Sequence, residues 1–312
     1  MAETVSTERK RWTLNIRRWA ALLLMMSILC TAAQAEIVPI PMDQDIMEEV
    51  QEKYYVSETE YEDPSIHVKL EFGDYLNTRY VVSRIKIADP SQIRAYTTGG
   101  KSLGKYPQYG TDIAKKVHSV FCLSGDVVAL TITKKGRHIE RMGKTWLSKA
   151  DGTIDCMIVD DKGDLHVIER ATEEDIAAFE GNIVSTYSFG PVLIMDGEQR
   201  TDFSYRASAI GGKKPAQRIC IGQTGPLEYI VVCCAGPDQK NEDGSKCRGL
   251  TVNEFADLVY SVGDGDIQIA YNLDGGSSSW VVFQEQKVNA FGNRSRRAIA
   301  DVIYFASAYQ ED

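Results

Sequence analysis

Residues 271–280 combine the residue types and spacing in this chain that best suit chemistry on an anion. They read YNLDGGSSSW, so Asn272 and Asp274 precede two consecutive glycines and three serine hydroxyls. A chain that turns through Gly275 and Gly276 can expose consecutive backbone N–H groups that bind a phosphate, with the carboxylate of Asp274 beside it. The same residues also suit a simple hairpin turn, because Asp-Gly is a common turn signal.

A bound phosphate needs positive charge, and we assign this role to Arg218 and Arg297. Arginine meets a phosphate with two parallel hydrogen bonds, a geometry that lysine does not reproduce. The alternative for both arginines is a salt bridge with a strand carboxylate such as Asp301. We expect Asp301 itself to be a structural residue. Arg294 and Arg296 extend Arg297 into a basic cluster, which either steers anionic molecules to the site or is a solvated loop.

The histidines and cysteines exclude several other kinds of site. The 4 histidines are scattered and no C-x-x-C pair occurs, so we expect no metal and no cofactor. A serine hydrolase that uses residues 277–279 would need a histidine within hydrogen-bond reach, and none accompanies them in the sequence. Of the 7 cysteines, six follow residue 35. An even number in an exported chain permits disulfides, with 15 possible full pairings.

Residues 1–35 have the three parts of an export signal. A basic stretch comes first, an apolar run covers residues 19–30, and the small residues Ala33 and Ala35 precede Glu36. The apolar run is shorter than the ~20 residues that span a membrane comfortably, and a retained membrane anchor is the alternative. We therefore predict cleavage after Ala35, a secreted or extracytoplasmic location, and no stable membrane span after the signal is removed.

The secreted protein should begin at Glu36, because Ala33 and Ala35 supply the small residues of the cleavage site. Mass spectrometry of the secreted fraction tests this. A mass that retains residues 1–35, recovered from the membrane fraction, would identify an anchor instead.

The charge of the chain argues against nucleic acid as a partner. The 35 Lys+Arg and 44 Asp+Glu residues give a net charge of −9, which becomes −12 once residues 1–35 are removed. Phosphate affinity in nucleic-acid binding comes largely from counterion release by basic residues. Any anionic substrate must therefore meet a local basic site.

The pattern of apolar residues predicts an α+β fold. Residues 81–87 alternate as a half-buried strand, and residues 156–168 read as a hairpin. Short helices are predicted from Thr172 through residue 179 and, with a capping box, from Thr251 to residue 262. Strands outnumber helices without a regular βαβ series, so we predict a mixed β-sheet domain with a few flanking helices.

The chain divides into three parts in this interpretation. Residues 1–35 are the signal peptide, residues 36–65 form an acidic N-terminal segment that is a surface helix or a tether, and residues 66–312 form one domain.

Four segments resemble the phosphodiester glycosidase family. Residues 272–279 are similar to its hallmark N-L-D-G-G-G-S-S, with Ser277 in place of the third glycine. Residues 188–197 resemble the family's F-G-P-x-L-x-x-D-G stretch, residues 217–223 its P-R-T-A-I-G-x strand, and residues 297–305 its closing R-x-I-x-D-x-I-Y-F strand. The segments follow the family order and cover roughly residues 110 to 306.

The resemblance implies a hydrolase that cleaves a sugar-1-phosphodiester in a glycan or cell-envelope polymer, without a cofactor. Cleavage of a glycosyl–phosphate bond passes through an oxocarbenium-like state, which carboxylates assist as nucleophile, base or acid. Asp274 is the first candidate for this role and Asp126 the second. The phosphate would be bound by the side chains and backbone of these residues: Arg218, Arg297, Asn272, Gly275, Gly276, Ser277 and Ser124.

One segment departs from the family pattern. The family carries N-G-D-Y-F or N-G-G-F-F near the start of the domain, whereas Ser124 here replaces the Asn and Val127-Val128 replace the aromatic pair. A serine hydroxyl does not span the distance of an asparagine amide. A non-catalytic glycan-binding or envelope-interaction protein on the same fold is therefore the alternative. Convergence of the candidate side chains in one pocket would favour the enzyme.

Overall fold

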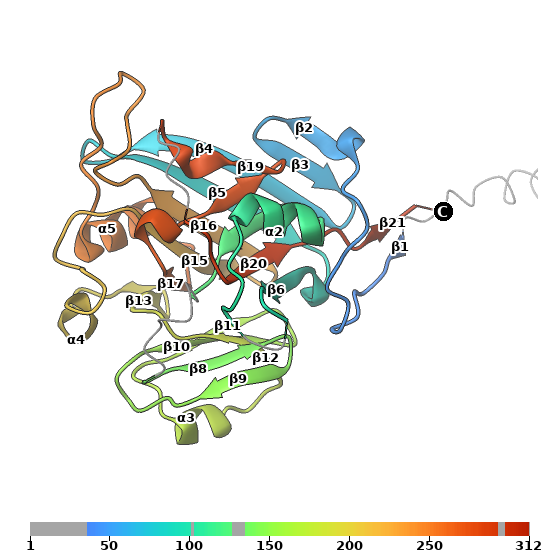
Figure 1. Cartoon of the computed structure of the whole chain (residues 1–312), viewed down its shortest axis with the longest axis horizontal. Coiled ribbons are helices and arrows are strands. Elements are labelled where there is room, and N and C mark those ends of the chain that lie inside the picture. Colours follow the sequence, from blue (N-terminus) through green and yellow to red (C-terminus); the bar gives the residue numbers. More distant parts are fainter. Residues whose placement is uncertain (1–35, 101–102, 127–134, 293–296, 312) are drawn as a thin grey trace, which may run out of the picture. The chain divides into compact units, whose positions relative to one another are not determined.

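The computed structural model describes residues 36–100, 103–126, 135–292 and 297–311 (Figure 1). The predicted signal peptide, Val127-Val128, Arg294 and Arg296 lie outside these residues. Among the described helices, none has the length and apolar character needed to cross a membrane.

The predicted strand at residues 81–87 is part of the long hairpin β4 (Ile66–Asp74) and β5 (Arg79–Ile87). Val81, Ile85 and Ile87 are buried, and Lys86 is exposed, as the alternation predicts. This hairpin lies in a nine-stranded sheet with the order β14-β13-β17-β15-β16-β5-β4-β3-β2. Its other strands are β2 (Tyr55–Ser57), β3 (Glu60–Asp63), β13 (Val192–Met195), β14 (Glu198–Gln199), β15 (Arg218–Gly225), β16 (Glu228–Cys234) and β17 (Ile269–Leu273).

A second sheet of five strands has the order β19-β18-β7-β20-β6. Its strands are β6 (Ile93–Thr97), β7 (Phe121–Ser124), β18 (Val281–Phe283), β19 (Gln286–Lys287) and β20 (Asp301–Phe305). The strand pairs with a described register run antiparallel in both sheets. The α+β class is confirmed.

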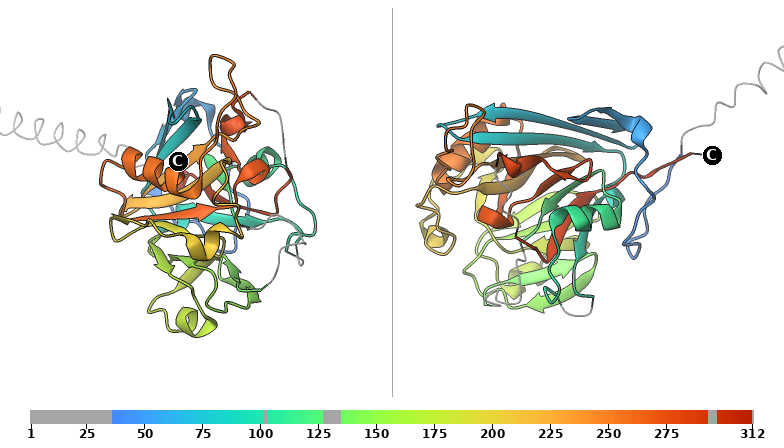
Figure 2. Two further views of the ribbon diagram at one scale, coloured as in Figure 1. Left: turned by 90° about the vertical axis from the view of Figure 1, so that its left-hand side faces the viewer. Right: turned by 45° about the horizontal axis from the view of Figure 1, so that its top comes forward.

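The two sheets pack face to face, with one helix on each outer face (Figures 1 and 2). Alternate residues of the nine-stranded sheet, such as Val231 and Leu273, share one core with Phe121 and Phe305 of the five-stranded sheet. The opposite face of the nine-stranded sheet packs against α5 (Val252–Val262), and that of the five-stranded sheet against α2 (Gly110–Val117). The burial of both faces explains why many strands are apolar throughout.

Local signals predicted two of the four described α-helices, and α2 and α4 (Ser204–Ala207) were not predicted. Thr251 and Glu254 form the predicted capping box of α5, which ends at Val262. A second capping box at Thr172 starts α3 (Glu173–Ala177), which ends two residues before the predicted residue 179. The remaining helical turns are α4 (Ser204–Ala207), η1 (Glu52–Tyr54), η2 (Pro90–Gln92), η3 (Gly276–Ser278) and η4 (Val288–Ala290).

A smaller β layer contacts β17 of the nine-stranded sheet and carries α3, as the green elements of Figure 1 show. It contains the predicted hairpin of β10 (Cys156–Asp160) and β11 (Leu165–Ile168), together with β12 (Ile183–Tyr187). Beside it lies the hairpin of β8 (His138–Arg141) and β9 (Lys144–Ser148). The very short strands β1 (Glu36–Ile37) and β21 (Tyr309–Gln310) lie near the two ends of the described chain.

The acidic segment of residues 36–65, expected as a short surface helix or a tether, is neither of these over most of its length. It contains η1, and β2 and β3 extend the nine-stranded sheet. The guanidinium group of Arg94 donates hydrogen bonds to the carbonyls of Pro41 and Gln44, at 2.8 and 2.7 Å, and so binds the start of the segment.

The six cysteines after residue 35 are all free and buried, so the permitted disulfides do not form. Burial raises the pKa of the thiols, for Cys233 to about 11, and they behave as small apolar core residues.

Candidate active site

The motif of residues 272–279 follows β17 and leads from one sheet to the other. β17 pairs with β13 and β15 in the nine-stranded sheet, whereas β18 pairs with β7 and β19 in the five-stranded sheet. The simple hairpin interpretation of this segment is therefore wrong, because its flanking strands are not partners.

The two glycines allow the chain to pass close to the backbone of Gln217 as it crosses between the sheets. A Cβ on Gly275 would lie 2.6 Å from the carbonyl oxygen of Gln217, and Gly276 has a φ of +62°. The Gly276 N–H donates to the Gln217 carbonyl at 2.8 Å, and the N–H groups of Ser278 and Ser279 donate within η3. The expected row of free backbone N–H groups is therefore not formed here, and side chains must supply most contacts with an anion.

Asp274 occupies an unusual environment for a carboxylate. Its Oδ2 atom is buried and has no hydrogen-bond partner among the described residues. Burial raises the pKa of Asp274 to about 7, while a hydrogen bond from Ser278 and the charges of Arg297 and Arg137 act to lower it. A carboxyl group with a pKa near 7 exchanges protons readily at neutral pH, which is the property of a general acid or base.

Three more buried polar atoms without a partner among the described residues lie on or near this segment. They are Asn272 Oδ1, Ser279 Oγ and Arg137 Nε. Asn272 shares a face of the chain with Asp274, and its Nδ2 donates to the Gly190 carbonyl at 2.8 Å. Buried polar groups in proteins are almost always hydrogen-bonded, so this concentration marks a binding site for a polar ligand.

The side chain of Arg297 lies beside this segment. Its Nη1 donates to Ser278 Oγ at 3.3 Å, its carbonyl accepts from Trp280 Nε1 at 2.9 Å, and its side chain is exposed. Its charge reaches the carboxylate of Asp274 and is available to an anionic ligand.

The side chain of Arg218 is engaged elsewhere. Its Nε donates to the Leu250 carbonyl at 2.8 Å, and its Nη2 donates to the carbonyls of Gly211 and Lys214 at 3.2 and 3.0 Å. It is buried, and burial lowers its pKa. These contacts favour a structural role, although the partners are backbone carbonyls and not the carboxylate of Asp301.

Replacement by lysine should have different effects on stability and on ligand binding at Arg218 and Arg297. Arg218→Lys loses several charged hydrogen bonds and should lower the free energy of unfolding by ~1–3 kcal/mol. Arg297→Lys should change stability by less than ~0.5 kcal/mol and weaken binding of an anionic ligand. Urea unfolding and ligand titration measure both effects. A stable Arg218→Lys variant with impaired ligand binding would restore the predicted role of Arg218.

Asp126 belongs to a fully buried ion cluster. Its Oδ1 pairs with Arg141 Nη2, and its Oδ2 accepts from the Ser188 N–H at 2.5 Å. Asp301 Oδ2 accepts from Nη2 and Nε of the same arginine, at 2.6 and 3.1 Å. A Cβ on Gly125 would lie 2.3 Å from Asp301 Oδ2, so only glycine fits against the cluster.

The cluster engages Asp126 fully and leaves it no oxygen free for a ligand. Both of its oxygens are engaged, and its charge acts on Asp274 by raising the pKa of that group. Arg141 was missed by sequence reasoning, because nothing in the local sequence marks it as the partner of two distant aspartates.

Ser124 connects β7 to the motif. Its Oγ accepts from the Trp280 N–H at 3.2 Å, and its N–H donates to the Trp280 carbonyl at 3.0 Å. Ser124, Asp126 and Arg297 therefore adjoin the segment that carries Asp274, whereas the Arg218 side chain does not join them.

The four histidines have partners away from residues 277–279. The contacts are His67 with Glu60, His118 with the Met47 carbonyl, His138 with Glu173, and His166 with Asp160. The serine hydrolase alternative therefore lacks its base.

The sequence analysis also did not identify Arg137 and Arg206, which lie near the motif of residues 272–279. Their guanidinium carbons are 6.0 and 5.8 Å from the ring centroid of Phe189. Phe189 lies within the family-like residues 188–197, but neither arginine stands in a segment with a recognisable spacing.

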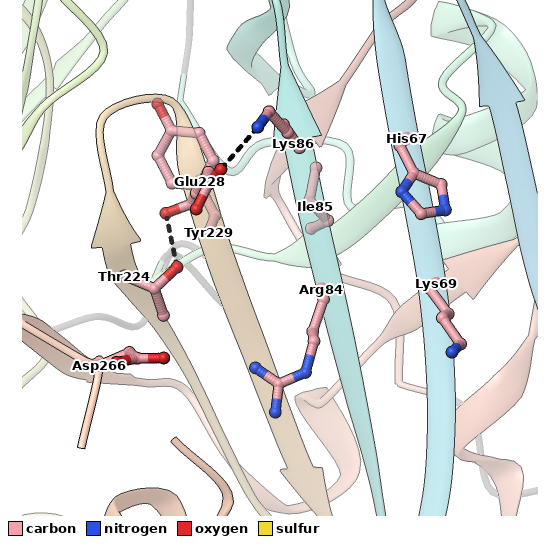
Figure 3. A pocket seen from close by; sticks show the side chains of 9 residues that line it. All are labelled: His67, Lys69, Arg84, Ile85, Lys86, Thr224, Glu228, Tyr229 and Asp266. Carbon is pink, nitrogen blue, oxygen red and sulfur yellow. Dashed lines mark hydrogen bonds and ion pairs between the residues drawn. The ribbon is translucent and has the colours of Figure 1, made fainter. Parts of the chain in front are cut away.

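A separate cavity of about 440 Å³ lies on the outer face of the nine-stranded sheet (Figure 3). It is lined by His67, Lys69, Arg84, Ile85, Lys86, Thr224, Glu228, Tyr229 and Asp266. Thr224 and Asp266 lie near the start of β17, whereas Asp274 follows its end, so this cavity is distinct from the candidate site.

Comparison with known families identifies the family to which this chain belongs. Residues 119–306 match the phosphodiester glycosidase family, which is more than half of the chain. The chain belongs to this family.

A solved structure shows the same fold. The catalytic domain of zebrafish N-acetylglucosamine-1-phosphodiester alpha-N-acetylglucosaminidase, auto-inhibited by its pro-peptide, is 17% identical, with a TM-score of 0.60 over 78% of this chain and 84% of that chain. A Synechocystis protein is 14% identical, with a TM-score of 0.48 over 77% of this chain and 62% of that chain. A search of curated proteins gave no match.

Proposed function

We propose that this chain hydrolyses the glycosyl–phosphate bond of a sugar phosphodiester, with Asp274 as the reacting carboxylate. The observation that carries the proposal is the buried, unpartnered oxygen of Asp274 beside the charges of Arg297 and Arg137. Nearby positive charge suits the phosphate of the substrate, and a carboxyl group with a pKa of about 7 suits acid–base catalysis of this reaction.

In the proposed reaction, the bond between the anomeric carbon and the phosphate oxygen breaks, and the phosphate leaves with the electron pair. Water supplies the hydroxyl group to the anomeric carbon, and its other proton passes to Asp274 as base. The products are a free sugar and a phosphomonoester. Alternatively, Asp274 attacks the anomeric carbon first, and water then hydrolyses the glycosyl ester. A phosphate leaving group needs little protonation, so one carboxylate suffices in either route.

The substrate is proposed to be a glycan or cell-envelope polymer that contains such a linkage. Export by the predicted signal at residues 1–35 would place the enzyme outside the cytoplasmic membrane with these polymers.

A non-catalytic glycan-binding protein is the second candidate. It is favoured by Ser124, whose hydroxyl is used to bind the Trp280 N–H, where the family carries asparagine. Such a protein would bind sugar phosphates without turnover.

A panel of sugar-1-phosphodiesters tests the two candidates. The enzyme releases both a free sugar and a phosphomonoester from at least one compound, and the release depends on Asp274. Saturable binding without release, in protein of native stability, would identify the binding protein.

The stability of the protein should reflect the burial of Asp274. An aspartate carboxyl group ordinarily has a pKa of 3.8, and burial raises the pKa of Asp274 to about 7 in the folded chain, so the folded state binds the proton more tightly between these pH values. The contribution of this group to stability is therefore present below pH ~4 and lost as the pH rises through 7. Asp274→Asn should raise the melting temperature at pH 8 by several degrees relative to the native protein, and by less at pH 5. Calorimetry at the two pH values measures this, and an equal difference at both would contradict it.

A further inference from the structure

Two arginines from distant parts of the chain meet on one aromatic ring. Arg137 directly precedes β8, and Arg206 lies on α4. Their guanidinium carbons lie 6.0 and 5.8 Å from the centroid of Phe189, and Arg206 Nε also donates to the Phe189 carbonyl at 2.8 Å. Contacts with the ring and with this carbonyl hold the orientation of the two planar groups.

The charge of Asp155 acts to raise the pKa of Arg206, but the described residues form no direct ion pair with either arginine. Among the described residues, no carboxylate lies within 4.0 Å of either guanidinium group, which is the distance of an ion pair. Burial and then the charge of Arg137 lower the pKa of Arg206, so the two groups repel each other. Such an arrangement is costly unless an anion binds both cations.

Arg137 uses only some of its N–H hydrogen-bond donors within the described part of the protein. Its Nη1 donates to the Asp126 carbonyl at 3.2 Å, and its buried Nε has no partner among the described residues. Arginine offers five N–H donors, so most of those on this side chain are available to a ligand.

Arg137 and Arg206 lie close to the motif that carries Asp274. Gly190, the neighbour of Phe189, accepts from Asn272 Nδ2, and the charge of Arg137 lowers the pKa of Asp274. An anion bound by the two arginines would therefore lie beside the carboxylate and not at a remote surface.

We propose that Arg137 and Arg206, oriented by Phe189, form the clamp that binds the phosphate group of the substrate. This inference rests on the proposed function and assigns the phosphate contacts that sequence reasoning gave to Arg218. A phosphodiester spreads its charge over two non-bridging oxygens, which matches two planar forks of N–H donors. The same contacts would stabilise the charge that grows on the leaving phosphate.

Binding of inorganic phosphate tests the clamp without relying on turnover. Arg206→Lys and Arg137→Lys should each weaken phosphate binding, measured by calorimetry, at least ~10-fold. In the native protein, 10 mM phosphate should raise the melting temperature, and this rise should shrink in the variants. Arg84→Lys, in the separate cavity of Figure 3, is the matched control and should bind phosphate as the native protein does.

Activity gives a second readout. If a substrate is turned over, Arg206→Lys should raise KM and lower kcat, whereas Arg84→Lys should change neither. If Arg137→Lys fails to fold because it loses the contact with Asp126, Arg206→Lys carries the test alone.

Different experimental results would contradict the clamp and the proposed function. Native phosphate affinity in folded Arg206→Lys and Arg137→Lys proteins would overturn the clamp, even in an active hydrolase. Absence of turnover with phosphate binding that depends on both arginines would overturn the proposed hydrolysis and leave the clamp in place.

Discussion

The Asp274→Asn variant is expected to hydrolyse a sugar-1-phosphodiester at least ~100-fold more slowly than the native protein. Asparagine retains the size and much of the hydrogen bonding of the side chain, but it accepts no proton and forms no glycosyl ester. A positioned acid–base group typically contributes a factor of ~100 to 10,000. The measurement is kcat/KM of both proteins with the same substrate.

The pH dependence should identify the form that reacts. If Asp274 acts as base or nucleophile, kcat/KM rises as the pH passes through about 7 and then levels off, because the carboxylate form is required. Asp266→Asn, at the other end of β17, is the matched control and should keep native activity. Near-native hydrolysis by Asp274→Asn would remove the catalytic assignment and leave Asp126 as the carboxylate to test.

Arg141→Met should cause the largest loss of stability among the single changes considered. It leaves Asp126 and Asp301, both fully buried, without their shared cation. Removal of one member of a buried ion cluster typically costs ~3–5 kcal/mol, because the remaining charges stay buried without compensation. Urea or guanidinium unfolding of the variant and the native protein measures this difference.

Arg248→Met provides the comparison for a surface pair. Arg248 pairs with Glu254 at 2.7 Å, but its side chain is 42% exposed, so its loss should cost far less stability than the loss of Arg141. A loss of similar size in the two variants would show that the Arg141 cluster contributes no more than an exposed salt bridge. Activity should also fall in Arg141→Met, since Asp126 and the segment around it support the site.

Several elements of the fold could be predicted because their signals are local. The alternation of residues 81–87, the turn between β10 and β11, and the capping box of α5 each depend on residues close together in the chain. The family resemblance also follows from short segments, and it pointed to Asp274 and Arg297.

The sequence by itself therefore determined the α+β class and the family, and it made Asp274 the first candidate for the reacting carboxylate. Only the tertiary structure decided which groups surround that carboxylate. Arg141 lies 15 residues from Asp126 and 160 from Asp301, yet the three are in contact. Arg218, which stands in a family-like strand, binds carbonyls, while Arg137 and Arg206 meet on Phe189. Side-chain partners of this kind depend on the packing of distant elements, and no periodicity or spacing along the chain encodes them.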